Sequence, residues 1–204
     1  MWLRGGHFSM PSKRVSEWPI DNAFLKRHSP RAFSKEKITE SMLLTLLEAA
    51  RWAPSSLNIQ PWRFVYSLRG DQAWNGLISS LRPYNHTSAC SASALVVFAS
   101  NRFHLPEGTE DPVLNPFHVF DTGAAWSCFS IQAAMSDWYV LPMGGFDSAA
   151  IAKNIRLPSD YSVHIVAAIG RMLDPSALTT NLGQNDAANN RRPLSETAFL
   201  GHFP

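Results

Sequence analysis

The chain has 204 residues, 45% of them hydrophobic and 17% charged, which is enough for one domain with a sizeable buried core. Its 18 basic and 16 acidic residues give a formal net charge of only +2. This excludes the strongly basic surface typical of proteins that bind nucleic acids or membranes, so a small molecule or another protein is the expected partner.

The ends of the chain and its cysteines indicate a cytoplasmic protein. Residues 1–9 lack the apolar core and cleavage pattern of a secretory signal, and no apolar run approaches the roughly 20 residues of a membrane-spanning helix. We expect residues 1–15 to form a disordered tail and residues 16–204 to form a single domain. Cys90 and Cys128 lie far apart in apolar stretches, which predicts two buried, reduced thiols and no disulfide or zinc site.

The first half of the chain predicts three helices and a strand. In order, we expect a helix over residues 21–27, a helix over 39–53, a strand over 62–68 and a helix over 71–81. Asp21 and Thr39 can cap the first two helices, and Pro54 stops the second. The apolar side chains of the second helix recur at i, i+3, i+4 and i+7, as in a helix that packs one face on a core. They are Leu43, Leu46, Leu47 and Ala50.

The second half predicts more apolar elements. In order, we expect a buried strand over residues 93–100, an irregular loop over 102–117, a long helix over 117–140, a turn over 141–147, a short helix over 148–155 capped by Asp147, and a buried strand over 162–170. A loop of this length is often a lid or an edge. The long helix carries little charge on any face, so it should lie in the core or in an interface. A polar, loop-like tail follows Leu173, and the mixture of elements predicts an α+β or α/β domain.

A dense set of phosphate ligands follows the first helix. Arg27, His28, Ser29 and Arg31 offer two guanidinium groups, an imidazole and a hydroxyl within five residues. Because arginine binds phosphate through two parallel hydrogen bonds, this density suits a phosphate site. The same string is also compatible with a solvated basic helix end.

A polar loop with proline at both ends begins at Pro54 and closes at Pro61. Its hydroxyl and amide side chains both donate and accept hydrogen bonds, as the edge of a pteridine-like ring requires. They are Ser55, Ser56, Asn58 and Gln60. The alternative is an ordinary polar connection between a helix and a strand. The phosphate ligands and this loop together look like the two halves of a site for flavin mononucleotide (FMN).

Two more places are candidates for the same site. The backbone of Met143-Gly144-Gly145 can approach a planar ligand closely because glycine has no side chain, although a helix C-cap and turn would also explain it. Arg191 and Arg192 could return from the C-terminal region to a phosphate, as could Arg171 after the last strand. Taken singly, each of these arginines is more often a surface charge.

The order of these motifs closely resembles that of the nitroreductase family of flavoenzymes. The matching segments lie between residues 21 and 196 and read RHSPRAF, LLEAARWAPSSLNIQPWRFV, DTGAAWSCFSIQAA, GGFD, IRLPSDYSVHIVAAIGR and RRPL. The resemblance implies an α+β fold with a central mixed, mainly antiparallel sheet flanked by helices. It also implies an intertwined homodimer with FMN at the subunit interface, in which the helix of residues 117–140 forms interface core.

The resemblance further implies which residues bind FMN. One subunit would hold the phosphate, the ribityl chain and a ring edge with Arg27, His28, Ser29 and Arg31, and Arg191 or Arg192 would complete the phosphate site. The other subunit would approach the same flavin with Pro54, Ser55, Ser56 and Asn58. Met143 and Gly144 would contact the isoalloxazine near its reactive nitrogen, and Asn85 matches a flavin-contacting asparagine of some members.

The chain departs from the family pattern in three places. Cys128 stands where many members have asparagine, and Ser88 stands where some have a basic residue. The region between Asn101 and Phe117 is short, whereas larger relatives insert a helical excursion over the active site. The substrate preference of those relatives therefore does not carry over.

The implied activity is a ping-pong oxidoreduction in which the flavin does the chemistry. NADH or NADPH would reduce FMN, and an electrophile such as a nitroaromatic, quinone or enal would then take the electrons. No residue of the chain needs to act as acid or base, and Arg31 is expected to support the negative charge of reduced flavin. The alternatives are a non-catalytic flavin-binding protein and a specialised member that is dehalogenase-like or azoline-oxidase-like.

Selectivity for NADPH needs cationic contacts to its 2′-phosphate, for which Arg63, Arg69 and Arg102 are candidates.

Overall fold

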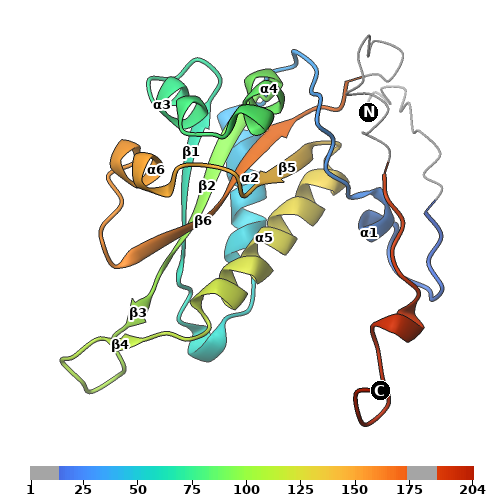
Figure 1. The fold of residues 1–204 in the computed structure, drawn as a ribbon, viewed down its shortest axis with the longest axis vertical. Helices are drawn as coiled ribbons and strands as arrows, with labels where there is room; N and C mark the ends of the chain where they lie inside the picture. The colour runs from blue at the N-terminus through green and yellow to red at the C-terminus, as the bar shows by residue number, and fades with distance from the viewer. Residues whose placement is uncertain (1–13, 174–187) are drawn as a thin grey trace, which may run out of the picture.

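The computed structural model describes residues 14–173 and 188–204, and a four-stranded sheet lies at its centre (Figure 1). The strands are ordered β1-β2-β6-β5, where β1 is Trp62–Leu68, β2 is Ala94–Asn101, β6 is Tyr161–Gly170 and β5 is Tyr139–Met143. All three strand pairings are antiparallel. The central strand β2 is apolar and almost wholly buried, because helices cover both faces of the sheet.

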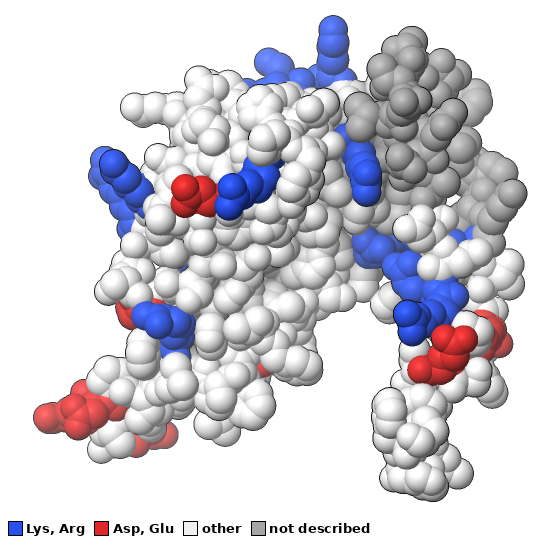
Figure 2. Space-filling model, viewed as in Figure 1, with Lys and Arg blue, Asp and Glu red and all other residues white. Residues whose placement is uncertain are grey.

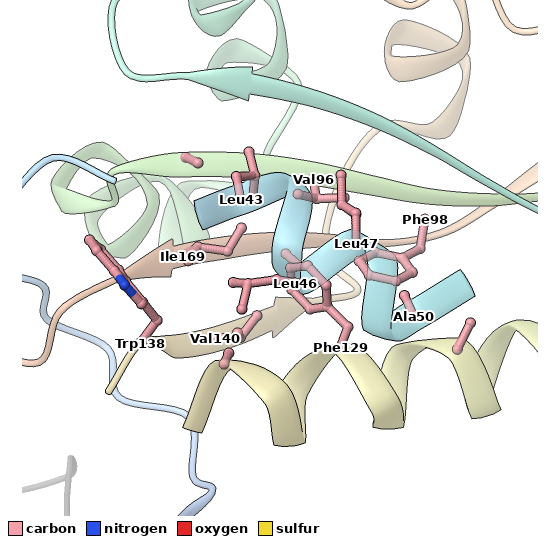
Figure 3. Packing of buried hydrophobic residues seen from close by; sticks show 14 of the residues in the cluster. Leu43, Leu46, Leu47, Ala50, Val96, Phe98, Phe129, Trp138, Val140 and Ile169 are labelled. Atoms are coloured by element: carbon pink, nitrogen blue, oxygen red, sulfur yellow. The ribbon is translucent and has the colours of Figure 1, made fainter. Parts of the chain in front are cut away.

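Six α-helices are found among the described residues. In chain order they are α1 (Asn22–Lys26), α2 (Glu40–Arg51), α3 (Trp74–Ser79), α4 (Pro83–Ser91), α5 (His118–Met135) and α6 (Ser148–Asn154). Helices α2 and α5 cover one face, where Leu46, Phe98 and Phe129 are fully buried (Figure 3). Helices α3, α4 and α6 cover the other face (Figure 1). The predicted α+β architecture, with an antiparallel sheet between helices, is confirmed.

The three predicted helix caps are confirmed. The Asp21 side chain accepts a hydrogen bond from the Ala23 amide, and Thr39 and Asp147 cap α2 and α6 in the same way. Each cap satisfies an amide that a helix start would otherwise leave without a partner.

The predicted helix of residues 117–140 is too long. Helix α5 ends at Met135, and residues 139–143, partly assigned to a turn, form the edge strand β5. The chain reverses at Asp137, whose φ of 60° lies outside the helical region. Contacts distant in sequence hold this reversal: Arg171 donates to the carbonyls of Ser136 and Asp137, and Lys26 pairs with the Asp137 carboxylate at 2.5 Å.

Helix α4 was not predicted, and two further expectations need correction. The loop of residues 102–117, expected to be irregular, contains a small hairpin of β3 (Phe103–His104) and β4 (Val113–Leu114), and the two cysteines, expected to be buried, are not. Cys90 is exposed on α4, with its sulfur 3.4 Å from His86 Nδ1, and Cys128 is only partly buried. Most side chains of α4 are polar, so the helix buries one narrow face and leaves Cys90 outside.

Some expectations concern residues outside the described part of the chain. Residues 1–13 of the predicted tail lie outside the described part, and so do residues 174–187 of the predicted polar segment that follows Leu173. Within residues 14–173 and 188–204, no helix is both long and apolar enough to cross a membrane.

A polar cluster joins three elements of the core. The Ser100 hydroxyl on β2 lies 2.7 Å from His118 Nδ1 on α5 and 2.7 Å from His164 Nε2 on β6. Burial lowers the pKa of both histidines. The positive charge of Arg102 lowers the pKa of His118 further, against the opposing effect of Asp121, and His118 does the same to His164. The cluster therefore favours neutral imidazoles.

We predict that acid weakens the fold through these two histidines. Because their folded-state pKa values lie below the unfolded value near 6.5, their contribution to stability is present above that pH. It is lost as the pH falls through the folded-state values. The melting temperature should drop on acidification from pH 7.5 to 5, and a His118→Gln, His164→Gln double variant should lose less. An equal drop in the two proteins would contradict this assignment.

Candidate functional site

The predicted phosphate ligands lie just beyond the end of α1. Arg27 is the C-cap of the helix and has extended backbone. Pro30 disfavours helix at Ser29, so the helix does not resume there. Arg27 Nη1 lies 3.4 Å from the Ser29 hydroxyl, which can accept its hydrogen bond. The His28 ring packs edge-on against Tyr139 of β5 at 4.8 Å, while Arg31 is exposed.

Three arginines gather around this segment. Arg14 donates to the carbonyls of Leu25 and Arg27 at 3.0 and 2.6 Å, and to Asn189 near the C-terminus at 2.7 Å. Burial, followed by the nearby charge of Arg191, lowers the pKa of both Arg14 and Arg27. Figure 2 shows basic side chains gathered around α1. We call Arg14, Arg27 and Arg191 the arginine cluster.

The arginine cluster has the electrostatics of an anion site. No carboxylate within residues 14–173 or 188–204 forms an ion pair with Arg27 or Arg191. Like charges held this close repel one another, and an anion between them would relieve that repulsion. Both C-terminal candidates are exposed, but only Arg191 lies close enough to Arg27 to lower its pKa.

The predicted ring contacts lie where β5 ends against α4. Asn85 is buried and donates to the Gly145 carbonyl at 2.9 Å, as does the Arg82 amide. A Cβ on Gly145 would lie 1.9 Å from the Tyr84 hydroxyl, so a larger residue there would have to displace the exposed Tyr84 ring. A Cβ on Gly144 would meet nothing within 4 Å. The Met143 side chain is buried in the core, which leaves only its backbone to face a ligand.

Hydrogen bonds tie the phosphate segment to the same side of the fold. The Phe33 amide donates to the Ser91 hydroxyl of α4 at 3.3 Å, and the Ser34 amide donates to the Arg171 carbonyl after β6 at 2.8 Å. These contacts join the residues just after Arg31 to the C-terminal end of α4 and to the end of β6. Arg171 itself bonds carbonyls and stacks on Trp138, so it serves the fold rather than a phosphate site.

The predicted polar loop is held by a buried carboxylate. The Ser56 amide donates to Oδ2 of Asp121, in the first turn of α5, at 3.2 Å. The Ser55 hydroxyl accepts from the Gln60 amide at 3.0 Å. Three residues of this loop, Leu57, Asn58 and Gln60, have positive φ. Asparagine tolerates this conformation, but it is unfavourable for leucine and glutamine, which implies that tertiary contacts impose the shape.

Within one chain, the two predicted parts of the FMN site, the phosphate ligands after α1 and the polar loop, lie far apart. The polar loop contacts the start of α5 through Asp121, whereas α1 contacts the turn after its end through the Lys26–Asp137 ion pair. The helical residues from Asp121 to Met135 span about 21 Å at 1.5 Å per residue. Figure 1 shows α1 and the α2–β1 loop at opposite ends of α5. Within one chain, the two segments therefore do not meet at one ligand.

Two residues of this region carry no sequence signal. Arg14 stands alone in the N-terminal segment, and Asp121 reads as an ordinary acidic residue in the first turn of a helix. Only the fold brings them to Arg27 and Ser56. The DTG string around Asp121 belongs to the family resemblance, which was the one available hint.

We predict that Asp121→Ala lowers the free energy of unfolding by about 1–3 kcal/mol, because the Ser56 amide loses its acceptor. Asp121→Asn, which keeps a side-chain oxygen, should cost less. Asp71→Ala is a matched control, since Asp71 accepts from the Leu68 amide at 2.8 Å on the exposed surface. Urea unfolding measures all three variants. If Asp121→Ala lowered the free energy of unfolding no more than Asp71→Ala does, the proposed role of Asp121 in holding the loop would be refuted.

Comparison with known proteins places the chain among flavoenzymes. The sequence profile of the Nitroreductase family matches residues 25–171. A solved structure described as an oxidoreductase containing FMN is 35% identical, covers 97% of this chain and 99% of its own, and superimposes with a TM-score of 0.89. A nitroreductase family protein from Streptococcus pneumoniae shares the fold at 15% identity over 87% of this chain and 98% of its own, with a TM-score of 0.70.

A sequence relative agrees with this assignment. A Streptomyces coelicolor protein, named provisionally as an NADH dehydrogenase/NAD(P)H nitroreductase, is 27% identical over 169 residues, which are 76% of this chain and 83% of the relative. Since the family profile covers most of the chain, including the phosphate segment, the polar loop and all four strands of the sheet, the protein belongs to the nitroreductase family.

Proposed function

We propose that the protein is a homodimeric FMN-dependent oxidoreductase. It passes reducing equivalents from NADH or NADPH to an electrophilic acceptor, such as a nitroaromatic, quinone or enal, by a ping-pong mechanism. The observation that carries this proposal is the arginine cluster beside Ser29, in which neither Arg27 nor Arg191 has an ion-pair partner among the residues that the structure describes. A phosphate dianion matches both its charge and its donors.

Each half of the FMN site has its own task. Arg27, Ser29 and Arg191 would hold the phosphate, with Arg14 fixing Arg27 through its carbonyl. His28, Arg31, Asn85 and the backbone of Met143 and Gly144 would face the ribityl chain and the ring. The polar loop of a second copy would supply Pro54, Ser55, Ser56 and Asn58. Arg192 remains an outer candidate at the phosphate.

The proposed dimer explains why the two halves lie apart in one chain. A second copy could bring its polar loop to the phosphate segment of the first. The surface suits this, because residues 188–204 run away from the sheet next to α1 and expose Leu200 and Phe203 (Figure 1). Helix α5 also exposes Phe120 and Met135, at 79% and 61%. Exposed apolar side chains in this number mark an interaction surface.

The bound flavin would supply the hydride and electron transfer chemistry, so the chain itself needs no acid or base. Its residues orient the ring and supply positive charge. Arg31 would stabilise the negative charge of reduced flavin from an exposed position. A cytoplasmic location is consistent with the two free cysteines and with NAD(P)H as donor.

The direct test is the absorption spectrum of the purified protein, followed by anaerobic addition of NADPH and then NADH. A flavin spectrum that either nucleotide bleaches supports the proposal. A flavin spectrum that neither nucleotide bleaches would indicate the non-catalytic binding protein or a specialised enzyme of the dehalogenase or azoline-oxidase type. A colourless protein that takes up no added FMN would refute the proposal.

We predict that Arg27→Ala weakens FMN binding about tenfold or more, because it removes a charged hydrogen bond to the phosphate. Arg31→Ala should weaken FMN binding and also slow flavin reduction. Fluorescence titration of the apoprotein and anaerobic stopped-flow reduction measure these effects. Lys153→Ala, on the exposed surface of α6, is the control. Wild-type affinity in Arg27→Ala would remove Arg27 from the site.

We also predict that Phe120→Asp yields a monomer that has lost tight FMN binding, because it places a charge on the apolar face of α5. Aspartate near a helix start does not disfavour the helix, so the fold should persist. Light scattering gives the mass, circular dichroism checks the fold, and titration gives the FMN affinity. A folded monomer that binds FMN as tightly as wild type would rule out a site shared between subunits.

A further inference from the structure

A groove of about 370 Å³ lies beside the polar loop. Leu57, Ile59 and Gln60 of the loop line it together with Arg63 of β1 and with Phe103 and His104 of the small hairpin. No carboxylate lines the groove, because the acidic residues of the hairpin lie at its tip, beyond His104. An aromatic ring, amide groups and one guanidinium suit a ligand with a flat ring and an anionic group.

Arg63 lines this groove with an exposed side chain. Its Nη1 donates to the carbonyls of Gln60 and Trp62 at 3.1 and 2.7 Å, which fixes the guanidinium plane. Its Nε and Nη2, which share one edge of that plane, have no acceptor among residues 14–173 and 188–204. A fixed plane with a vacant edge is preorganised for the two oxygens of a phosphate.

In the other two arginines proposed for a 2′-phosphate, Nε and Nη2 already donate hydrogen bonds within the chain. Arg69 donates through Nε and Nη2 to the carbonyls of Ala92 and Ser91, at 2.6 and 2.9 Å. Arg102 donates through the same two nitrogens to Asp160 and Ser159, at 3.4 and 2.7 Å. Both side chains therefore hold the backbone together, and only Arg63 among the three keeps its edge for a ligand.

We infer that this groove binds the adenosine end of NADPH and that Arg63 determines specificity by binding its 2′-phosphate. The inference rests on the proposed function. Leu57 and Ile59 flank Asn58 on the loop that would approach the flavin of a second copy, so a donor at that flavin could extend into the groove. Phe103 offers a ring for the adenine. NADH lacks the 2′-phosphate and gains nothing from the vacant edge of Arg63.

The kinetic test compares both donors in Arg63→Gln and in the control Lys153→Gln. Arg63→Gln should raise KM for NADPH about tenfold or more, since a charged hydrogen-bonded pair is lost. KM for NADH, kcat and FMN content should stay near the wild-type values, and Arg63→Lys should restore part of the loss. Equal increases in KM for the two donors, or none, would overturn the inference while leaving the FMN oxidoreductase intact.

A binding measurement separates this inference from the proposed function. Calorimetric titration with adenosine 2′,5′-bisphosphate and with adenosine 5′-phosphate needs no electron transfer. We expect the bisphosphate to bind more tightly to wild type and to Lys153→Gln, and Arg63→Gln to remove that difference. If the protein takes up no flavin, the oxidoreductase proposal fails. This titration still decides whether Arg63 binds the 2′-phosphate. An unchanged preference in Arg63→Gln would refute the site.

Discussion

The rigid length of α5 is the constraint on which the arrangement of this protein depends. The helix packs against the sheet through Phe129 and Phe98, whose rings meet edge-on at 5.3 Å in the core. One end clamps the polar loop through Asp121, and the other leads into the turn that receives Lys26. Because a packed helix neither bends nor shortens at low cost, these two regions stay separate in each chain. A ligand that needs both must be bound by two chains.

The arginine cluster carries an energetic cost that binding would recover. Arg14, Arg27 and Arg191 come from three distant parts of the chain and repel one another where they meet. Backbone carbonyls compensate in part, since Arg14 donates to three of them. A bound anion would relieve the remaining repulsion, and its binding energy would add to the stability of the fold by mass action.

Local patterns in the sequence predicted most of the fold. Helix α2 follows from its one-sided apolar stripe and its Thr39 cap, and β2 and β6 follow from short apolar runs. The strand β5 was not predicted, because only Ser136 and Asp137 separate its apolar segment from the apolar residues of the helix. Only the long-range contacts of Arg171 and Lys26 with the turn at Asp137 separate the two elements. Helix α4 was missed because its polar surface gives little periodicity.

The residues of the candidate site also divide into those that local sequence predicts and those that only the fold brings together. Strings such as RHSPR and PSSLNIQP indicate ligand chemistry because their donors are close together in sequence. The roles of Arg14, Asp121 and Arg63 can be recognised only from the folded chain. Arg14 and Asp121 bind residues elsewhere in the sequence, and the Nε and Nη2 of Arg63 have no acceptor within the described part of the chain.

Placing one site on two chains also has a genetic consequence for the proposed dimer. A variant defective in Arg27 and another defective in Asp121 would each be inactive alone, because every site contains the defect. A mixed dimer of the two would concentrate both defects in one site and leave the other site with wild-type residues throughout. Two inactive alleles in the same cell would then restore part of the activity, and this complementation requires no exchange of sequence between them.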